Sequence, residues 1–255
     1  VMRKSLVALA FLSSSVFSTA GQAQDWTGLY VGAHAGYGWG DWDGKLETTA
    51  GCPAACPPNK DAGYLNPYRT IDADGWLGGL QVGYNWRLQG PIVIGFEADI
   101  SWTDMDGSGT FDTDKYGRSV WSKQHDLELD YFGTARVRLG YAAQSVLPYI
   151  TGGLAWGKTS GDLAVTYIPP AGVGGTSYAS TDENHVGWTI GAGVEYAISS
   201  NLSIKAEYLY VDLGDEDYLF KGETYTGLPF DTDSFASDLT FDVVRVGLNY
   251  KLGDF

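Results

Sequence analysis

The stretch that decides the fold is VGWTIGAGVEY, residues 186–196. Its even positions are all apolar or aromatic, including Trp188 and Tyr196, whereas its odd positions hold glycine, threonine and Glu195. Successive side chains of a β-strand point to opposite faces of the sheet. The stretch therefore predicts a strand with one apolar face and one polar face that is rich in glycine.

The same alternation recurs along the rest of the chain. Glycine accounts for 35 of the 255 residues and aromatic residues for 14%, a composition that favours strands and turns. The predicted fold class is therefore all-β. The eight expected strands are residues 29–39, 76–86, 92–102, 127–141, 147–157, 186–196, 202–211 and 239–252.

The connections between these strands alternate in length. Short turns are expected at residues 87–91, 142–146 and 197–201, and long loops at residues 40–75, 103–126, 158–185 and 212–238. This order puts both chain ends on the short-turn side, and each strand is long enough for a tilted membrane crossing. The sequence predicts a closed, eight-stranded antiparallel transmembrane β-barrel with short periplasmic turns and four long extracellular loops.

Alternation alone does not say which face meets lipid, because a soluble lipocalin-type barrel carries its apolar residues inside. Two features favour apolar residues outside. The polar face is rich in glycine, as a narrow lumen requires, whereas glycine on a solvent-exposed face would only weaken a strand. Aromatic residues also recur near the strand ends, which predicts two girdles at the membrane interfaces. These aromatic residues are Trp26, Tyr37, Trp39, Trp76, Trp86, Trp102, Tyr131, Tyr141, Trp156, Trp188, Tyr196, Tyr208, Tyr210 and Tyr250.

The N-terminal stretch has the features of a secretory signal peptide. Arg3 and Lys4 are followed by a short apolar run at residues 6–17 and by small residues that end at Ala23. We expect cleavage after Ala23, which leaves one outer-membrane barrel domain over residues 24–255. An N-terminal membrane anchor is the alternative, but the apolar run is too short to span a bilayer comfortably.

Charge and cysteine content narrow the partners. The chain has 16 Lys+Arg and 31 Asp+Glu, a net charge of −15, which argues against nucleic acid. Cys52 and Cys56 are the two cysteines, and in an exported protein this close, even pair predicts a local disulfide. A metal site would need more cysteine or histidine nearby, and no cofactor is expected.

The inner face of the expected barrel carries charges of both signs. They are Glu97, Asp99, Glu128, Asp130, Arg136, Arg138, Glu195, Lys205, Glu207, Arg245 and Lys251. Charges in a narrow lumen must pair, because an isolated buried charge is costly. The network is either a plug of ion pairs or the lining of an ion path, and the small lumen of eight strands favours the plug.

Other candidate sites match known motifs only in part. His34, His125 and His185 stand outside any hydrolase motif, so no catalytic residue and no enzyme is expected. Four aspartates at alternate positions resemble the start of an EF-hand calcium loop, but Lys115 stands where that loop has its bidentate glutamate. The four are Asp104, Asp106, Asp112 and Asp114. Acidic residues in the loop at 212–238 suggest that divalent cations are shared with lipopolysaccharide phosphates.

Five segments resemble the Omp25/Omp31-type outer-membrane proteins of alphaproteobacteria. The opening strand DWTGLYVGAHAGYGWG at residues 25–40 carries the resemblance, together with residues 78–86, 147–157, 191–196 and 246–251. The segments span the mature chain in order. The resemblance implies an OmpA-like eight-stranded barrel in the outer membrane, with no catalytic residue to carry over. The terminal Phe255 resembles the family's assembly signal, although it is out of phase with the last strand.

The resemblance also implies a set of functions. Members are described as structural envelope proteins and surface antigens, as small porins that conduct ions or small solutes, and in some cases as haemin binders. We expect a structural, surface-exposed barrel, with the small porin and the loop-mediated binding of haemin or host surfaces as alternatives. The expected partners are outer-membrane lipid, lipopolysaccharide and, during biogenesis, the barrel-assembly machinery.

Overall fold

Eight strands form the whole of the described fold. The computed structural model describes residues 24–48, 69–112, 120–168, 175–223 and 229–252. No helix among these residues is long and apolar enough to cross a membrane. The strands are β1 (Gly28–Thr48), β2 (Arg69–Arg87), β3 (Ile92–Asp112), β4 (Val120–Tyr141), β5 (Val146–Ile168), β6 (Gly175–Ala197), β7 (Leu202–Glu223) and β8 (Pro229–Lys251).

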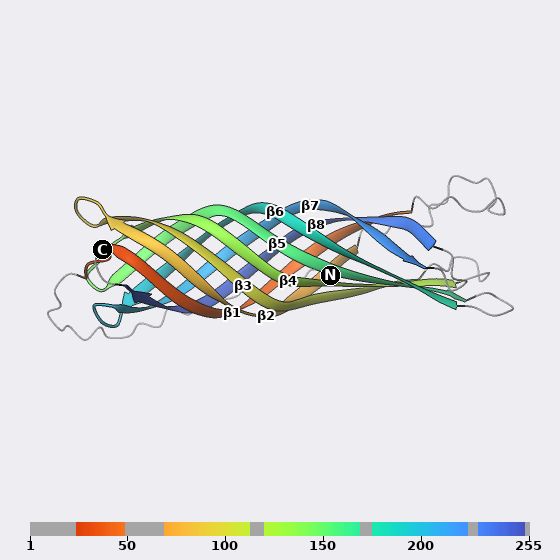
Figure 1. The fold of residues 1–255 in the computed structure, drawn as a ribbon, viewed down its shortest axis with the longest axis horizontal. Coiled ribbons are helices and arrows are strands. Elements are labelled where there is room, and N and C mark those ends of the chain that lie inside the picture. Colours follow the sequence, from red (N-terminus) through yellow and green to blue (C-terminus); the bar gives the residue numbers. More distant parts are fainter. Residues whose placement is uncertain (1–23, 49–68, 113–119, 169–174, 224–228, 253–255) are drawn as a thin grey trace, which may run out of the picture.

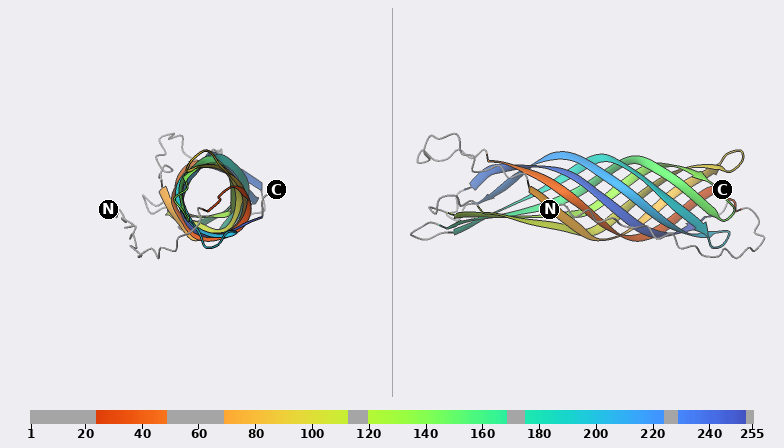
Figure 2. Two further views of the ribbon diagram at one scale, coloured as in Figure 1. Left: turned by 90° about the vertical axis from the view of Figure 1, so that its left-hand side faces the viewer. Right: turned by 180° about the vertical axis from the view of Figure 1, so that it is seen from behind.

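The strands close into one antiparallel barrel in sequence order (Figure 1). β8 pairs back onto β1, so that Val31 lies opposite Tyr250. Viewed end-on, the strands form a closed ring (Figure 2). Closure leaves no lateral sheet edge to be satisfied in lipid. The prediction of a closed, eight-stranded antiparallel barrel is confirmed.

The strands are much longer than predicted. They run for 19 to 23 residues, and the additional length lies at the end of the barrel that carries the long connections. Large parts of the four expected loops are therefore strand, and the predicted loop boundaries at 40–75, 103–126, 158–185 and 212–238 are wrong. The sequence stays in period-two alternation there, but the apolar residues change sides.

The change of sides is clearest on β7. Its inward side chains begin as Ser203, Lys205 and Glu207 and continue as Leu209 and Val211, all of them buried. Its outward side chains are apolar or aromatic up to Tyr210, and Asp212 follows. Burial of apolar groups away from water is favourable. Where the outer face is apolar, the surrounding medium is therefore lipid, and where the apolar side chains point inward instead, the outer face meets water.

Aromatic residues mark the level at which the outside changes. On six strands an outward aromatic residue stands next to the first polar outward position, and on β6 only Val186 separates Trp188 from that position. Together these seven aromatic residues form what we term the aromatic belt. The belt consists of Trp39, Trp76, Trp102, Tyr131, Trp156, Trp188 and Tyr210. The part between the short turns and the belt is here the membrane half, and the part beyond the belt is the long-loop half.

The long-loop half has the core of a soluble protein. Sixteen buried apolar residues fill it, and Phe132 meets Phe241 edge to face with ring centroids 5.2 Å apart. Its outer surface is mostly polar, with exposed carboxylates such as Asp72, Asp106 and Asp126, although Tyr178 and Val186 of β6 are exposed there too. This half follows the ordinary rule of apolar inside and polar outside.

A separate apolar cluster closes the short-turn end. Trp26 is only 6% exposed and lies inside the barrel with Val93, Ala142, Leu147 and Ala197. Trp26 was predicted to belong to an aromatic girdle, and this prediction is wrong. The segment that holds it is tied to the barrel rim by the Lys251 ammonium, which donates to the Asp25 carbonyl oxygen at 3.1 Å.

Candidate functional site

Eight charged side chains meet inside the membrane half. Four carboxylates and four cations are all buried there, and because their numbers are equal their formal charges cancel. We term this set the lumen network. Its members are Glu97, Asp99, Glu195 and Glu207 with Arg136, Arg138, Lys205 and Arg245. They project inward from β3, β4, β6, β7 and β8, as expected from the alternation of each strand.

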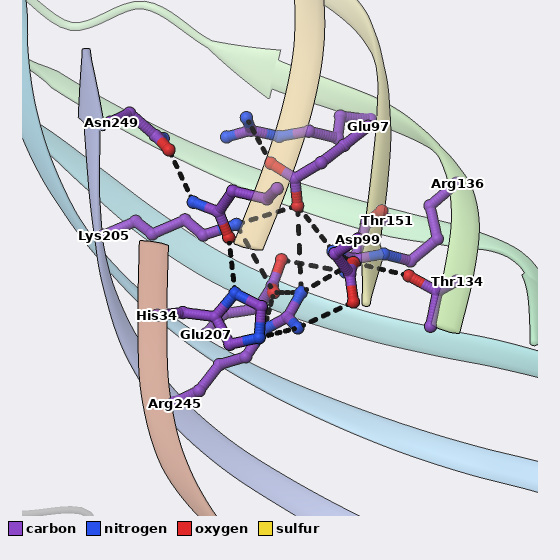
Figure 3. Close-up of polar contacts among 12 residues, drawn as sticks. His34, Glu97, Asp99, Thr134, Arg136, Thr151, Lys205, Glu207, Arg245 and Asn249 are labelled. Atoms are coloured by element: carbon purple, nitrogen blue, oxygen red, sulfur yellow. Dashed lines mark hydrogen bonds and ion pairs between the residues drawn. The ribbon is translucent and has the colours of Figure 1, made fainter. Parts of the chain in front are cut away.

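Glu97 is the hub of the network (Figure 3). It lies 2.5 Å from Arg136 Nη2 and 2.8 Å from Lys205 Nζ, and 3.4 Å from Arg138 Nη1. The Tyr30 hydroxyl donates at 2.7 Å to Glu97 Oε2, the oxygen that Arg138 also approaches, whereas Arg136 and Lys205 contact Oε1. One carboxylate thus joins cations from two strands on different sides of the lumen.

Arg245 and Arg136 bridge two further carboxylates. Arg245 donates to Glu207 from Nε at 2.7 Å and to Asp99 Oδ1 from Nη1 at 3.0 Å. Arg136 donates to the same two carboxylates at 3.0 and 2.9 Å. The Thr134 hydroxyl also donates a hydrogen bond of 2.6 Å to the Asp99 carboxylate. Forked contacts of this kind fix orientation, because the guanidinium is planar and rigid.

Arg138 extends the network towards the short turns. It pairs with Glu195 at 2.7 Å, and its guanidinium lies 3.9 Å from the centre of the Tyr149 ring. Glu195 also accepts hydrogen bonds from the Ser203 hydroxyl at 2.5 Å and from the Asn249 amide at 2.9 Å.

The network is tolerable in the interior because its charges balance and its carboxylates are fully bonded. Removing an ion from water costs several kcal/mol, and mutual attraction offsets this only when the geometry is good and the remaining lone pairs are used. Glycines supply the space. A Cβ at Gly83 would lie 2.3 Å from the Tyr30 hydroxyl that serves Glu97. What the arrangement can do chemically is fill and rigidify the lumen.

Both ends of the network are covered. The apolar core of the long-loop half lies beyond it on one side, and the Trp26 cluster lies on the other. At the short-turn end a cavity of about 30 Å³ is bordered by Trp26, Asn85 and Asn249. That is room for roughly one or two water molecules.

Three predicted members of the network lie elsewhere. Glu128 is exposed, and Asp130 faces outward, 3.6 Å from Lys158, so their assignment to the lumen is wrong. The cause is a β-bulge between Leu129 and Tyr131, which reverses the facing of β4 beyond it. Lys251 is half-buried at the barrel rim, where it bonds the Asp25 carbonyl, and it borders the cavity at the short-turn end.

The histidines bring a hydroxyl–imidazole pair into the lumen. His34 Nε2 lies 2.8 Å from the Ser101 hydroxyl, and its Nδ1 lies 3.0 Å from Gln81 Oε1. Both residues are buried beside Arg245, inside the sealed membrane half. His185 lies in the long-loop half, with Nε2 2.8 Å from the Thr159 hydroxyl.

Sequence reasoning missed the neutral partners of the network. Tyr30, Tyr149, Gln81 and Asn249 each bond a network residue or His34. Their signal was their inward position within the alternation. Burial of an inward tyrosine or amide makes a polar partner necessary, so such residues belong with the charges from the start.

The remaining candidates lie outside the lumen or outside the described residues. Asp104 and Asp106 are exposed on the outer wall of β3, and Asp104 accepts a hydrogen bond from the backbone N–H of Trp76. Asp112 is in β3 but its side chain lies outside the described residues, as do Asp114, the His125 side chain, Cys52, Cys56 and residues 1–23. In the described part of the chain no group of three His, Cys, Asp or Glu side chains is placed to hold a metal ion.

Known proteins resemble this chain over most of its length. Residues 5–251 match the family described as outer membrane protein beta-barrel domain. The 31 kDa outer-membrane immunogenic protein of Brucella melitensis is 35% identical over 89% of this chain and 83% of its own, and the 25 kDa outer-membrane immunogenic protein of the same organism is 27% identical over 89% and 79%. The outer membrane protein OprG from Pseudomonas aeruginosa covers 93% of this chain and 100% of its own with a TM-score of 0.47 and 11% identity. The chain therefore belongs to the outer-membrane β-barrel family that includes the Omp25/Omp31-type proteins, and its place is the outer membrane.

Proposed function

We propose that this protein is a sealed, non-catalytic barrel that serves the outer membrane as a structural and surface-exposed element. The observation that carries the proposal is the lumen network, in which four carboxylates and four cations neutralise one another across the full width of the membrane half. A conducting path would need water between these groups, and they are instead in direct contact.

The Ser101–His34 pair supports the non-catalytic part of the proposal. A nucleophile needs an accessible hydroxyl and a base that is oriented by a third group. Ser101 is fully buried, and the group on the far side of His34 is the neutral amide of Gln81. Neither Ser101 nor His34 presents an exposed surface to a substrate.

Planar-bilayer recording tests the proposal against the small porin. Purified protein is added to a bilayer in parallel with a conducting porin as positive control and detergent alone as negative control. The sealed barrel gives no discrete current steps at neutral pH, whereas repeated steps of uniform size would establish a conducting lumen. Insertion is checked on the same membranes by the protease resistance of the barrel.

The outer wall of the long-loop half is where we place the contact with lipopolysaccharide. Exposed carboxylates lie there, among them Asp72, Asp74, Asp104 and Asp106, directly beyond the aromatic belt. Divalent cations would join these carboxylates to lipid phosphates, since Mg²⁺ and Ca²⁺ prefer oxygen ligands. Binding to lipopolysaccharide vesicles should depend on Mg²⁺ and weaken when the four residues are changed to asparagine. Unchanged binding would reject this contact and leave the sealed barrel standing.

A further inference from the structure

The barrel wall loses its backbone pairing along two seams in the long-loop half. The β2–β3 ladder ends at Asp74 opposite Asp106, although residues 69–73 stay paired to β1 and residues 107–112 to β4. The β6–β7 ladder stops at Trp188 opposite Asp212 and resumes only at Ser180 opposite Lys221. Among the described strands, the other six interfaces are interrupted by two residues at most on either strand.

The two seams lie on opposite sides of the barrel. Four strands separate them in a ring of eight, so they divide the long-loop half into a leaf of β3–β4–β5–β6 and a leaf of β7–β8–β1–β2. At the long-loop end of Figure 1, the green and teal strand ends lie apart from the blue and orange ones. The same separation is seen from behind in Figure 2.

An aspartate beside the aromatic belt begins each seam. Asp104 accepts the backbone N–H of Trp76 at the start of the β2–β3 seam. Asp212 accepts the backbone N–H of Gly214 at 2.9 Å at the start of the β6–β7 seam. Gly214 has a φ of +78°, and the β7 register against β8 shifts between Asp212 and Asp215. A glycine in this conformation is typical of a β-bulge, so the end of the ladder is encoded in the sequence.

Apolar packing joins the two leaves where the ladders do not. The first leaf contributes Met105, Leu127, Leu129, Phe132, Ala155 and Ala179 to the core. The second contributes Trp42, Ile71, Ala73, Leu77, Leu209, Val211, Leu213, Leu239, Phe241 and Val243. Apolar contact is not directional, whereas a ladder of hydrogen bonds holds its strands in one register.

We propose that the long-loop half is a two-leaf clamp, which separates along both seams while the membrane half stays closed. Separation breaks no strand pairing within either leaf, and at the seams it breaks little more than the three pairs between residues 178–180 and 221–223. The membrane half cannot follow, because continuous ladders surround it and the lumen network ties β3, β4, β7 and β8 together. The open clamp presents its apolar lining to the cell exterior, a property that a rigid barrel lacks.

Spin-label distances test the clamp at exposed positions. Ser108 and Ser180 mark the two edges of one leaf, since Ser108 pairs with Asp126, Asp126 with Asp162 and Asp162 with Ser180. The Ser108→Cys/Ser180→Cys pair therefore reports within a leaf. The Asp41→Cys/Asp126→Cys pair reports between leaves, from β1 to β4. Both pairs are made in a Cys52→Ser/Cys56→Ser background and reconstituted in lipid.

The clamp predicts one narrow distance for the pair within the leaf, and a broader or two-peaked distribution for the pair between leaves. A disulfide across the β2–β3 seam gives the matched control. A Cβ at Gly107 would lie 3.2 Å from Ala73 Cβ, a few tenths of an ångström short of disulfide geometry, and 2.7 Å from Ile71 Cγ2. With Ile71→Ala to make room, Ala73→Cys/Gly107→Cys should lock the leaves when oxidised. Equally narrow distances for both pairs would overturn the clamp.

Thiol accessibility gives a second readout in the same background. Leu239→Cys lies in the core of the clamp, and Ser101→Cys lies at a buried site of the membrane half. An impermeant maleimide should modify Leu239→Cys and leave Ser101→Cys unmodified, and the oxidised lock should slow the reaction at Leu239→Cys, as expected for local opening. Two equally inert thiols would contradict the proposal, and the distances at exposed sites decide the matter if Leu239→Cys does not fold.

Discussion

Lys205 offers the most direct test of the balanced lumen. Its ammonium lies 2.8 Å from Glu97 and 3.8 Å from Glu207, with no exposed side-chain surface. Lys205→Met keeps the length of the side chain but leaves four buried carboxylates with three cations. Removing one partner of a buried ion pair costs about 3–5 kcal/mol, because the other charge stays behind without compensation. We expect Lys205→Met to lower the free energy of unfolding by that amount.

A substitution of Glu97, the ion-pair partner of Lys205, distinguishes the effect of lost charge balance from the effect of lost packing. Glu97→Gln alone leaves three carboxylates with four cations and should also cost about 3–5 kcal/mol. The double variant restores neutrality with three of each. We expect it to lose about 3 kcal/mol, rather than the roughly 6–10 kcal/mol that additivity would give, so the coupling energy is at least about 3 kcal/mol.

Equilibrium unfolding in urea, with the barrel refolded into lipid vesicles, measures these free energies through tryptophan emission and the gel mobility of unboiled samples. The half-exposed pair Lys158 and Asp130, 3.6 Å apart, serves as matched control, and Lys158→Met should cost less than about 1 kcal/mol. Either of two results would refute the reasoning: a loss of unfolding free energy below about 1 kcal/mol for Lys205→Met, or losses in the double variant that equal the sum of the two single variants.

Three further predictions concern other parts of the barrel. Burial lowers the pKa of His185 from 6.5 to about 4, so between these pH values the unfolded chain takes up a proton that the folded chain does not. The free energy of unfolding should therefore fall by up to about 3 kcal/mol as the pH drops from 6.5 to 4. Urea titrations at several pH values should show a weaker pH dependence for His185→Gln. Gly83→Ala should cost about 1–3 kcal/mol, because its methyl group displaces the Tyr30 hydroxyl, whereas Gly78→Ala, whose Cβ would have its nearest neighbour at 3.8 Å, should be close to neutral in the same titration. Trp26→Ala should cost about 3–5 kcal/mol and lower the melting temperature of unboiled samples, since it empties the cluster at the short-turn end; an unchanged melting temperature would show that this cluster is not part of the folded core.

The membrane half could be predicted from the sequence because one physical rule governs it. Lipid outside and a narrow lumen inside impose strict alternation, and residues 186–196 show it without a break. The same rule places Glu97, Asp99 and Arg136 inside, where the structure has them. Which of them touch could not be read from one strand, since contacts across a lumen depend on the stagger of all eight strands.

The long-loop half was missed because its alternation has the opposite sense. Leu209 and Val211 continue the inward row of Lys205 and Glu207, so the period persists while the apolar side changes. A change of sides that follows an aromatic residue is a readable sign that a strand leaves lipid for water. The bulge beside Asp130 has no comparable sign, and it is what placed Glu128 on the wrong face.

The central claim is that the wall passes from lipid to water at the aromatic belt, and β5 tests it most directly. Single spin labels at the outward positions of Ile150, Leu154, Lys158 and Asp162 are compared for their accessibility to oxygen, which concentrates in lipid, and to a water-soluble nickel chelate. The account predicts oxygen-dominated labels at Ile150 and Leu154 and chelate-dominated labels at Lys158 and Asp162, with the change at Trp156. Oxygen-dominated accessibility that continues to Asp162, or chelate access at Leu154, would contradict it.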